Sequence, residues 1–325
     1  MGSKSKIDWT DKTWNVTSGC TKVSSGCKHC YAETMHGRLR AMGQSKYQHD
    51  FGEVRCHPEF LERPMRWTKP WLVFVDSMSD LFHPDVPFEF IAAVFGVMAA
   101  CPQHTFQILT KRPEIMRAWF EWIGTKGPLW DDPLLGASWY ETLKQKAGGE
   151  PEVWDEADAC VQFAQSHGAS AVFNIDDDAA AHGGRIGPGW PLPNVWLGTS
   201  VEDASTTHRI ADLALTPAAV RFVSYEPALE KIDPFDVDGP AAVRMSEINP
   251  KVVTFPGEAI DWFIAGCESG PKARQADNDW FRWMRDRCGE LEMPFFLKQM
   301  MVDGQLVKMP ELDGKVWDQM PRRQP

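Results

Sequence analysis

Six short apolar runs recur along the 325-residue chain, and polar or turn residues follow each of them. The runs are rich in Val, Ile and Phe, which is typical of strands buried on both faces of a parallel sheet. They span residues 71–75, 105–109, 195–198, 220–223, 262–266 and 294–297. No other feature restricts the fold as much, because strands of this kind alternating with helices indicate an α/β architecture.

Segments with helical periodicity lie between these runs. In residues 87–100 the apolar side chains fall on one helical face and Pro87 suits the first turn. Similar patterns occur at 113–123, 204–215 and 278–292, the last with Asn278 or Asp279 as the expected N-cap. We therefore predict a parallel sheet with helices, either open or closed into a barrel.

Residues 127–193 interrupt this alternation. They are rich in Gly, Pro and acidic residues, with helical patterns only near 138–146 and 153–167. We predict one α/β domain over residues 1–325, in which 127–193 is an insertion between the third and fourth strands and 302–325 is a C-terminal extension.

The net charge of −11 argues against a surface that binds nucleic acid non-specifically, because phosphate contacts require clustered Lys and Arg. No apolar run approaches the roughly 20 residues that span a bilayer. The N-terminal residues also lack the apolar middle region of a signal peptide. We expect a cytoplasmic protein without a membrane partner.

Each predicted strand ends in polar residues, in order "DSMSDLFH", "TKRP", "TSVED", "SYEP", "CESG" and "KQM". In parallel α/β folds the carboxyl ends of the strands meet and form sites. Turns and helix caps also favour Ser, Thr and Asp, so each exit alone has a structural explanation. Four charged residues beside apolar strands favour a shared polar mouth, because unpaired buried charge is costly: Lys111, Glu226, Glu268 and Lys298.

The stretch "CTKVSSGCKHCY" places Cys20, Cys27 and Cys30 close together. Eight cysteines are too few for a disulfide scaffold, so this cluster indicates metal or redox chemistry. A structural zinc site needs a fourth ligand, for which the candidates are His29, His36, Cys56 and His57. Three thiolates on an iron–sulfur cluster leave one iron open, which favours catalysis.

The pattern CxxxxxxCxxCY resembles the cysteine motif of the radical S-adenosylmethionine (SAM) superfamily, although six residues separate the first two cysteines where that superfamily usually has three. Further segments, including "VFVDSMSDLFHPDVP", "HTFQILTKRPE", "VRFVSYEPAL" and "PFFLKQM", resemble in order a phage and prophage protein family with a three-cysteine motif. The resemblance covers residues 7–125 and 191–301. It implies a partial (β/α)6-type, TIM-like barrel and a [4Fe-4S] cluster held by Cys20, Cys27 and Cys30.

The same resemblance implies reductive cleavage of SAM to a 5′-deoxyadenosyl radical that abstracts a substrate hydrogen, with flavodoxin or ferredoxin as an external one-electron reductant. The implied SAM contacts are His29, Ser77, Ser79, Asp80, Ser200, Glu202 and Glu226. The implied catalytic or substrate residues are Lys111, Glu268, Lys298 and Cys267, the last as a hydrogen-atom donor. A structural salt bridge for Lys111 and an inert core thiol for Cys267 are the alternatives.

Relatives in this family lie in phage genomes beside enzymes of DNA base hypermodification, which implies rearrangement of an amino-acid-modified thymine in phage DNA within the host cytoplasm. Lesion repair of the spore photoproduct lyase type is the nearest enzymatic alternative. A non-catalytic, zinc-binding partner module is the alternative from another class. A DNA-sized substrate requires a local basic face, for which the candidates are Arg38, Arg40, Arg63, Arg66, Lys69, Lys111 and Arg112.

Overall fold

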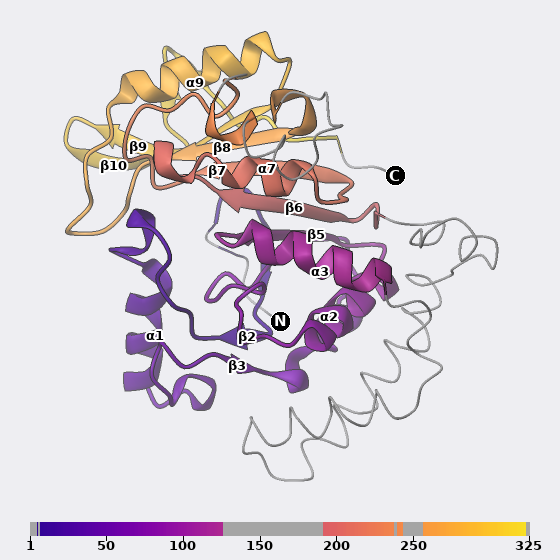
Figure 1. Cartoon of the computed structure of the whole chain (residues 1–325). Helices are drawn as coiled ribbons and strands as arrows, with labels where there is room; N and C mark the ends of the chain where they lie inside the picture. The colour runs from indigo at the N-terminus through magenta and orange to yellow at the C-terminus, as the bar shows by residue number, and fades with distance from the viewer. Residues whose placement is uncertain (1–4, 6, 126–190, 237–238, 243–255, 323–325) are drawn as a thin grey trace, which may run out of the picture.

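A computed structural model describes residues 5, 7–125, 191–236, 239–242 and 256–322. Its centre is an eight-stranded sheet in the order β1-β4-β5-β6-β7-β8-β9-β10. The strands are β1 (Lys12–Trp14), β4 (Leu72–Val75), β5 (Thr105–Thr110), β6 (Val195–Ser200), β7 (Val220–Tyr225), β8 (Trp262–Gly266), β9 (Phe295–Val302) and β10 (Gln305–Lys308). Neighbours from β1 to β9 are parallel, and β10 is antiparallel to β9. The sheet curls into a half-barrel (Figure 1).

The six predicted strands are confirmed as β4 to β9, and the α/β class with a mostly parallel, partial barrel is confirmed with them. Two strands of the sheet were not predicted. The three-residue β1 is too short for a recognisable pattern, and β10 lies in the expected C-terminal extension. Asp303 and Gly304, both with positive φ, form the hairpin turn before β10, as Asp-Gly pairs commonly do. Residues 127–193, predicted as an insertion, fall in sequence between β5 and β6, the third and fourth strands of the sheet. Up to position 190 they lie outside the described residues, so the insertion stays a prediction.

Four helices confirm the four helical patterns: α2 (Phe88–Ala100), α3 (Pro113–Thr125), α7 (Arg209–Ala214) and α9 (Asn278–Glu290). The expected N-cap of α9 was wrong by at least one residue, because the Asp277 side chain accepts the Asp279 backbone N–H while the Asn278 amide donates to the Met301 carbonyl. A fifth helix, α1 (Tyr31–Ala41), follows the three cysteines. In the described part of the chain, none of the helices has the length and apolar character that crossing a membrane requires.

Shorter elements complete the described structure. The paired strands β2 (Thr17–Ser18) and β3 (Arg55–Cys56) flank the cysteine region, and β11 (Glu311–Leu312) pairs with β12 (Lys315–Val316) near the C-terminus. Short 3-10 helices span Ser25–Cys27, Ser45–Tyr47, Pro58–Phe60, Arg63–Arg66, Ala204–Thr206 and Pro256–Ala259. The 3-10 helix Ala204–Thr206 occupies the first part of the predicted helix 204–215, so α7 is shorter than expected.

Alternate side chains of the strands enter two separate cores. The larger core lies between the sheet and the helices α2, α3, α7 and α9 and includes Val73, Val223 and Phe263. The smaller core covers the other face and consists of Trp9, Leu72, Phe74, Trp196, Val220, Phe222, Trp262, Ile264 and Phe296. Gly198 admits the Phe222 ring there, since a Cβ at this position would lie 2.5 Å from the ring. The strand residues of this core lie mainly in the first halves of the strands, which leaves the polar exits for the other end.

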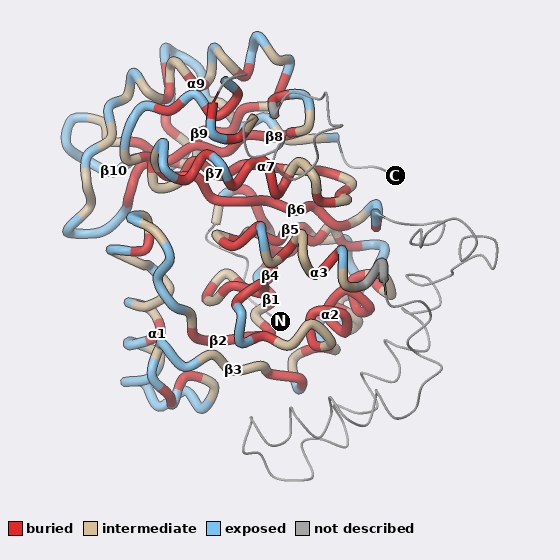
Figure 2. Tube along the Cα trace, in the orientation of Figure 1, coloured by how far each residue is buried: buried red, intermediate tan, exposed pale blue. Residues whose placement is uncertain are grey.

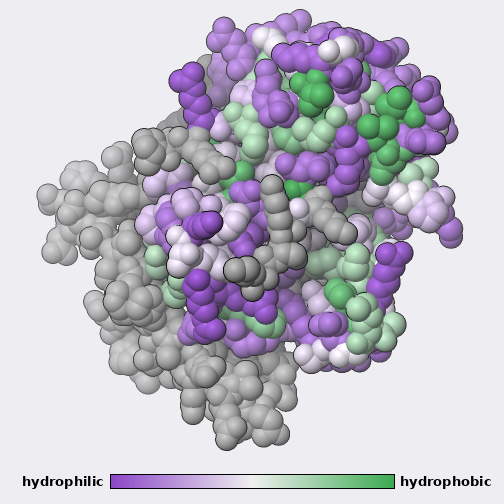
Figure 3. Space-filling view, turned by 180° about the vertical axis from the view of Figure 1, so that it is seen from behind, coloured by the Kyte–Doolittle hydropathy of each residue, from purple (hydrophilic) through white to green (hydrophobic). Residues whose placement is uncertain are grey.

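Burial follows the same division. Strands β4 to β9 of the sheet are mostly buried, whereas β10 and α1 are largely exposed (Figure 2). From behind, the described surface mixes hydrophilic residues with small separate hydrophobic patches (Figure 3).

Candidate functional site

The loop that carries the three cysteines lies at the carboxyl ends of the parallel strands, on the side where the arrows of the sheet end (Figure 1). Asp76, directly after β4, fixes the start of this loop by accepting the backbone N–H groups of Val16 and Thr17 at 2.7 and 2.9 Å. Gly19 then forms a bridge to Ser79. Its φ of +84° and the Glu53 carbonyl oxygen, 2.1 Å from where a Cβ would lie, both require glycine at this position.

Arg112, after β5, ties the first cysteine to the sheet. This buried guanidinium donates to the Cys20 Sγ at 3.6 Å, the Thr21 carbonyl at 2.8 Å and Asp80 Oδ2 at 2.9 Å. Asp80 also accepts from Thr110 Oγ1 at 2.7 Å and from the Phe82 N–H at 3.1 Å. Asp80, which was predicted to contact SAM, thus accepts from the same Arg112 that donates to Cys20.

Glu202, after β6, ties the middle of the loop. Its side chain is fully buried and accepts from Ser24 Oγ and from Arg209, both at 3.0 Å, and from Lys111 Nζ. Gly26 packs directly on it, because a Cβ on Gly26 would lie 2.5 Å from Glu202 Cγ. The predicted site residues Lys111 and Glu202 thus form one ion pair beneath the loop, which is the structural role considered as an alternative for Lys111.

Glu268, after β8, ties the last part of the loop. It accepts from Arg274 Nη2 at 2.6 Å and from the Arg274 backbone N–H at 2.8 Å, and it contacts His29 Nδ1 at 3.1 Å. Burial alone would raise the pKa of Glu268, but the hydrogen bonds from Arg274 and His29 outweigh it and hold the pKa at about 2. Glu268 is therefore a charged anchor for the segment between Cys27 and Cys30.

The three cysteines carry free thiols, with Cys27 buried and Cys20 and Cys30 half-buried. Burial, reinforced by the Asp80 charge, raises the pKa of Cys20 to about 11, and burial also raises the pKa of Cys30. Among the residues that the structure describes, no three His, Cys, Asp or Glu side chains are grouped as a metal ion would need. The assignment of these cysteines as metal ligands therefore stays a prediction.

Glu226, after β7, and Lys298, in β9, are charged residues at strand exits that, within the described ranges, pair with each other rather than with the cysteine loop. They make an ion pair with each other, and 21% and 18% of the two side chains is exposed. The Gln299 amide lies 3.5 Å from Glu226 Oε1 and donates to the Cys267 carbonyl at 2.7 Å. In the described part of the chain, the hydrogen bonds and ion pairs of Glu226 and Lys298 do not reach the cysteine loop.

Of the remaining predicted site residues, two lie beside the cysteine loop and two are buried. Ser79 accepts from Thr17 Oγ1 at 2.7 Å, and Ser77 donates to the Asn15 side chain at 3.1 Å, so both lie beside the loop. Ser200 is buried, and its carbonyl accepts from Arg209 at 2.9 Å. Cys267 lies fully buried in the helix-side core, where burial raises the pKa of its thiol to about 11. This placement agrees with an inert core thiol.

Sequence reasoning missed several residues that build this site: Asp76, Arg209 and Arg274. Asp76 could have been found, because it directly follows a predicted strand, as the other site residues do. Arg209 and Arg274 carry no such signal, since one lies in a helix and the other in an irregular loop. Their roles follow only from the carboxylates that they contact, Glu202 and Glu268.

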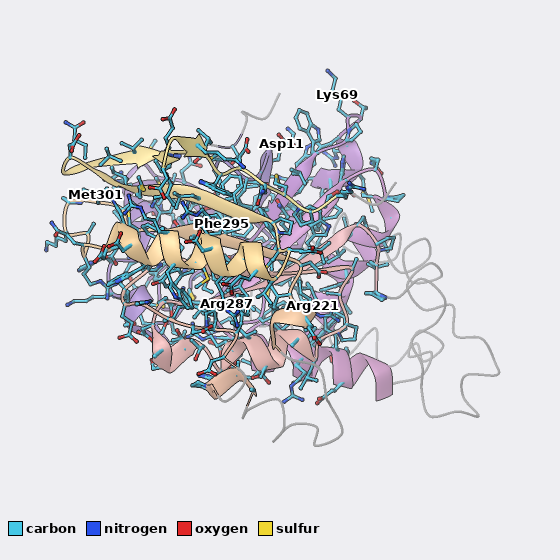
Figure 4. All side chains as sticks on the ribbon, turned by 90° about the horizontal axis from the view of Figure 1, so that it is seen from above. Asp11, Lys69, Arg221, Arg287, Phe295 and Met301 are labelled. Carbon is cyan, nitrogen blue, oxygen red and sulfur yellow. The ribbon has the colours of Figure 1, made fainter. Side chains whose placement is uncertain are left out.

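The basic face considered for a DNA-sized substrate does not form as one surface. Lys69 lies at the end of the sheet where the strands begin, near Asp11 (Figure 4), whereas Lys111 and Arg112 lie at the opposite end. Lys111 and Arg112 are also neutralised by Glu202 and Asp80.

Comparison with known proteins gives a family but no function. No curated protein and no solved structure matches the chain. The model of a family described as a protein of unknown function (DUF5131) matches residues 4–321, nearly the whole sequence. The chain therefore belongs to this family of unknown function.

Proposed function

We propose that the protein is a radical SAM enzyme in which Cys20, Cys27 and Cys30 hold a [4Fe-4S] cluster. The observation that carries this proposal is the three-thiol loop, tied to three different strand exits through Asp80, Glu202 and Glu268. These contacts hold all three cysteines on one anchored segment at the carboxyl ends of the strands. Once reduced by an external one-electron donor, the bound cluster would cleave SAM and so supply a 5′-deoxyadenosyl radical for hydrogen abstraction from the substrate.

The residues around the loop fit a thiolate-ligated group. The Arg112 N–H points at the Cys20 Sγ, and hydrogen bonds to ligand sulfurs are one means by which proteins tune cluster potentials. The resemblance assigned Asp80 and Glu202 to SAM. In our proposal they act as positioning residues, because Asp80 already accepts from Arg112 and Glu202 already accepts from Ser24 and Arg209. Four of the predicted SAM contacts retain partial exposure, namely His29, Ser77, Ser79 and Glu226.

For the substrate, we propose an amino-acid-modified thymine, in phage DNA or as a nucleotide, which undergoes rearrangement. The Glu226–Lys298 pair supports this choice, because its two partly exposed charges match the ammonium and carboxylate of an amino-acid group. A target base in a duplex would have to be flipped out to reach this position. Repair of a DNA lesion is the nearest alternative, and it offers no amino-acid group to this pair.

Anaerobic reconstitution with iron and sulfide tests the cofactor proposal. We expect a brown protein with about four irons per chain that cleaves SAM after reduction by dithionite. Cys27→Ala should lose the iron. Cys56→Ala is the matched control, because Cys56 is a half-buried cysteine outside the loop and was a candidate fourth zinc ligand. A colourless protein that binds one zinc and loses it in Cys56→Ala would instead establish the zinc-binding module.

Mass spectrometry of nucleosides tests the substrate. Phage DNA that carries amino-acid-modified thymine is incubated with the reduced enzyme and SAM, then digested. We expect a nucleoside of unchanged mass with a new retention time, because a rearrangement moves atoms without adding any. Unchanged nucleosides, with SAM cleavage intact, would reject this substrate and leave the cofactor proposal standing.

A further inference from the structure

The exposed side of the cysteine loop and α1 has an unusual charge. This surface, residues 22–42, is called the loop–α1 surface. It carries four basic residues, Lys22, Lys28, Arg38 and Arg40, against the single acidic Glu33, hence a net charge of +3 within a chain of net charge −11. All four basic residues are exposed. The positive charge next to the thiols is therefore local and contrary to the rest of the molecule.

The same surface exposes apolar side chains. The described residues include five large hydrophobic side chains that are exposed, and three of them lie here: Val23 at 45%, Tyr31 at 62% and Met42 at 71%. The last two are the most exposed of the five. Of the α1 residues, only His36 is buried, and Figure 2 shows the helix as a largely exposed element. A helix that leaves most of its surface uncovered beside a proposed redox centre has the character of an interface.

We propose that the loop–α1 surface docks a small acidic protein that carries one electron to the cluster. This inference rests on the proposed function, which requires an external reductant. In the step itself one electron leaves the reduced carrier and enters the cluster, so the carrier is oxidised, the cluster is reduced, and no bond or proton moves. Tyr31 directly follows Cys30, and Arg38 lies eight residues beyond Cys30, about 12 Å along the helix axis. A carrier seated here therefore lies next to the thiols.

The surface suits an acidic protein better than a nucleic acid. Lys22 pairs with Glu33 at 2.9 Å and Arg40 with Asp50 at 2.6 Å, so carboxylates lie among the cations. These carboxylates act on any anionic partner alike, but a duplex backbone offers no apolar partner for Val23, Tyr31 and Met42, whereas a protein surface does. Transient electron-transfer interfaces are small, with charges that steer the encounter and apolar contacts at the centre.

Reduction kinetics of the reconstituted protein test this assignment. Reduced flavodoxin is the probe, and bleaching of the cluster absorbance is followed by stopped flow. Arg38→Glu should lower the second-order rate constant about 3- to 10-fold at low salt, and the difference should shrink above about 0.5 M salt, where charges are screened within a few ångströms. Lys69→Glu is the matched control, since it makes the same charge change on an exposed residue at the far end of the sheet (Figure 4).

A second reductant separates docking from folding and from cofactor loading. Dithionite is small and needs no docking surface, so it should reduce the wild type and both variants at equal rates. Equal flavodoxin rates for Arg38→Glu and Lys69→Glu, with the cluster present in both, would overturn the docking surface and leave the proposed function intact. An Arg38→Glu variant that loses affinity for duplex DNA while flavodoxin reduces it at the wild-type rate would also overturn the docking surface. A protein without cluster absorbance would overturn the proposed function itself.

Discussion

Two groups of carboxylates at the same end of the sheet have opposite surroundings. Asp80, Glu202 and Glu268 accept hydrogen bonds from the cysteine loop or from a residue bound to it, and their side chains are 0–7% exposed. Glu226 pairs with Lys298, and 21% of its side chain is exposed. We call the first group the anchoring carboxylates. Position at a strand exit therefore does not distinguish a carboxylate that holds the cysteine loop from one that is available to a ligand. The hydrogen-bond donors around each carboxylate make that distinction.

The largest effect is expected at Glu202, the most deeply buried anchoring carboxylate. Glu202→Ala leaves Lys111 and Arg209 without their shared partner and should lower the free energy of unfolding by about 3–5 kcal/mol. Urea unfolding of the metal-free protein measures this. Glu226→Ala is the control and should cost about 1 kcal/mol or less. Equal losses in the two variants would remove the distinction between the groups.

Arg112 sharpens the comparison because it connects an anchoring carboxylate to a thiol. Arg112→Gln leaves Asp80 buried beside weaker donors and should cost about 3 kcal/mol. It also removes the cationic N–H donor to Cys20, so the midpoint potential of the reconstituted cluster should fall, since such hydrogen bonds stabilise the reduced form. A redox titration monitored by electron paramagnetic resonance measures the potential. An unchanged potential would show that Arg112 holds the loop without tuning the sulfur.

How much of this was predictable differs between the fold and the site. Periodicity located the amino ends of β4 to β9 within one residue, because continuous Val, Ile and Phe runs have few alternatives in a buried parallel sheet. It could not find β1, whose three residues include the polar Lys12 and Thr13. The strand exits indicated Glu226 and Glu268, and the family resemblance added Asp80 and Glu202. Their separation into anchors and an exposed pair depended on Arg112, Arg209 and Arg274, whose contacts span long sequence distances or irregular loops.

Glu268 adds a dependence on pH. Its pKa in the folded protein is about 2, below the ordinary value of 4.5. Its stabilising contribution is therefore fully present above about pH 4.5 and is lost as the pH falls towards 2. Unfolding free energies of the wild type and Glu268→Gln should differ most near neutral pH and converge across this range. A difference that stays constant from pH 6 to pH 2.5 would contradict the anchoring role of the charge.

The smallest effect on stability is expected for the Glu226–Lys298 pair. Exchanging the two residues, as Glu226→Lys with Lys298→Glu, retains the ion pair and should change the free energy of unfolding by less than about 1 kcal/mol, because partly exposed pairs contribute little. The exchange reverses the positions of the two charges, so a ligand that uses both should bind at least 10-fold more weakly.

Equilibrium binding of SAM and of the modified nucleoside to the reconstituted protein identifies which of them contacts the pair. Loss of SAM affinity alone would assign Glu226 to the cofactor, whereas loss of nucleoside affinity alone would assign the pair to the substrate. A swap that destabilised the fold as much as Glu202→Ala would place Glu226 among the anchoring carboxylates.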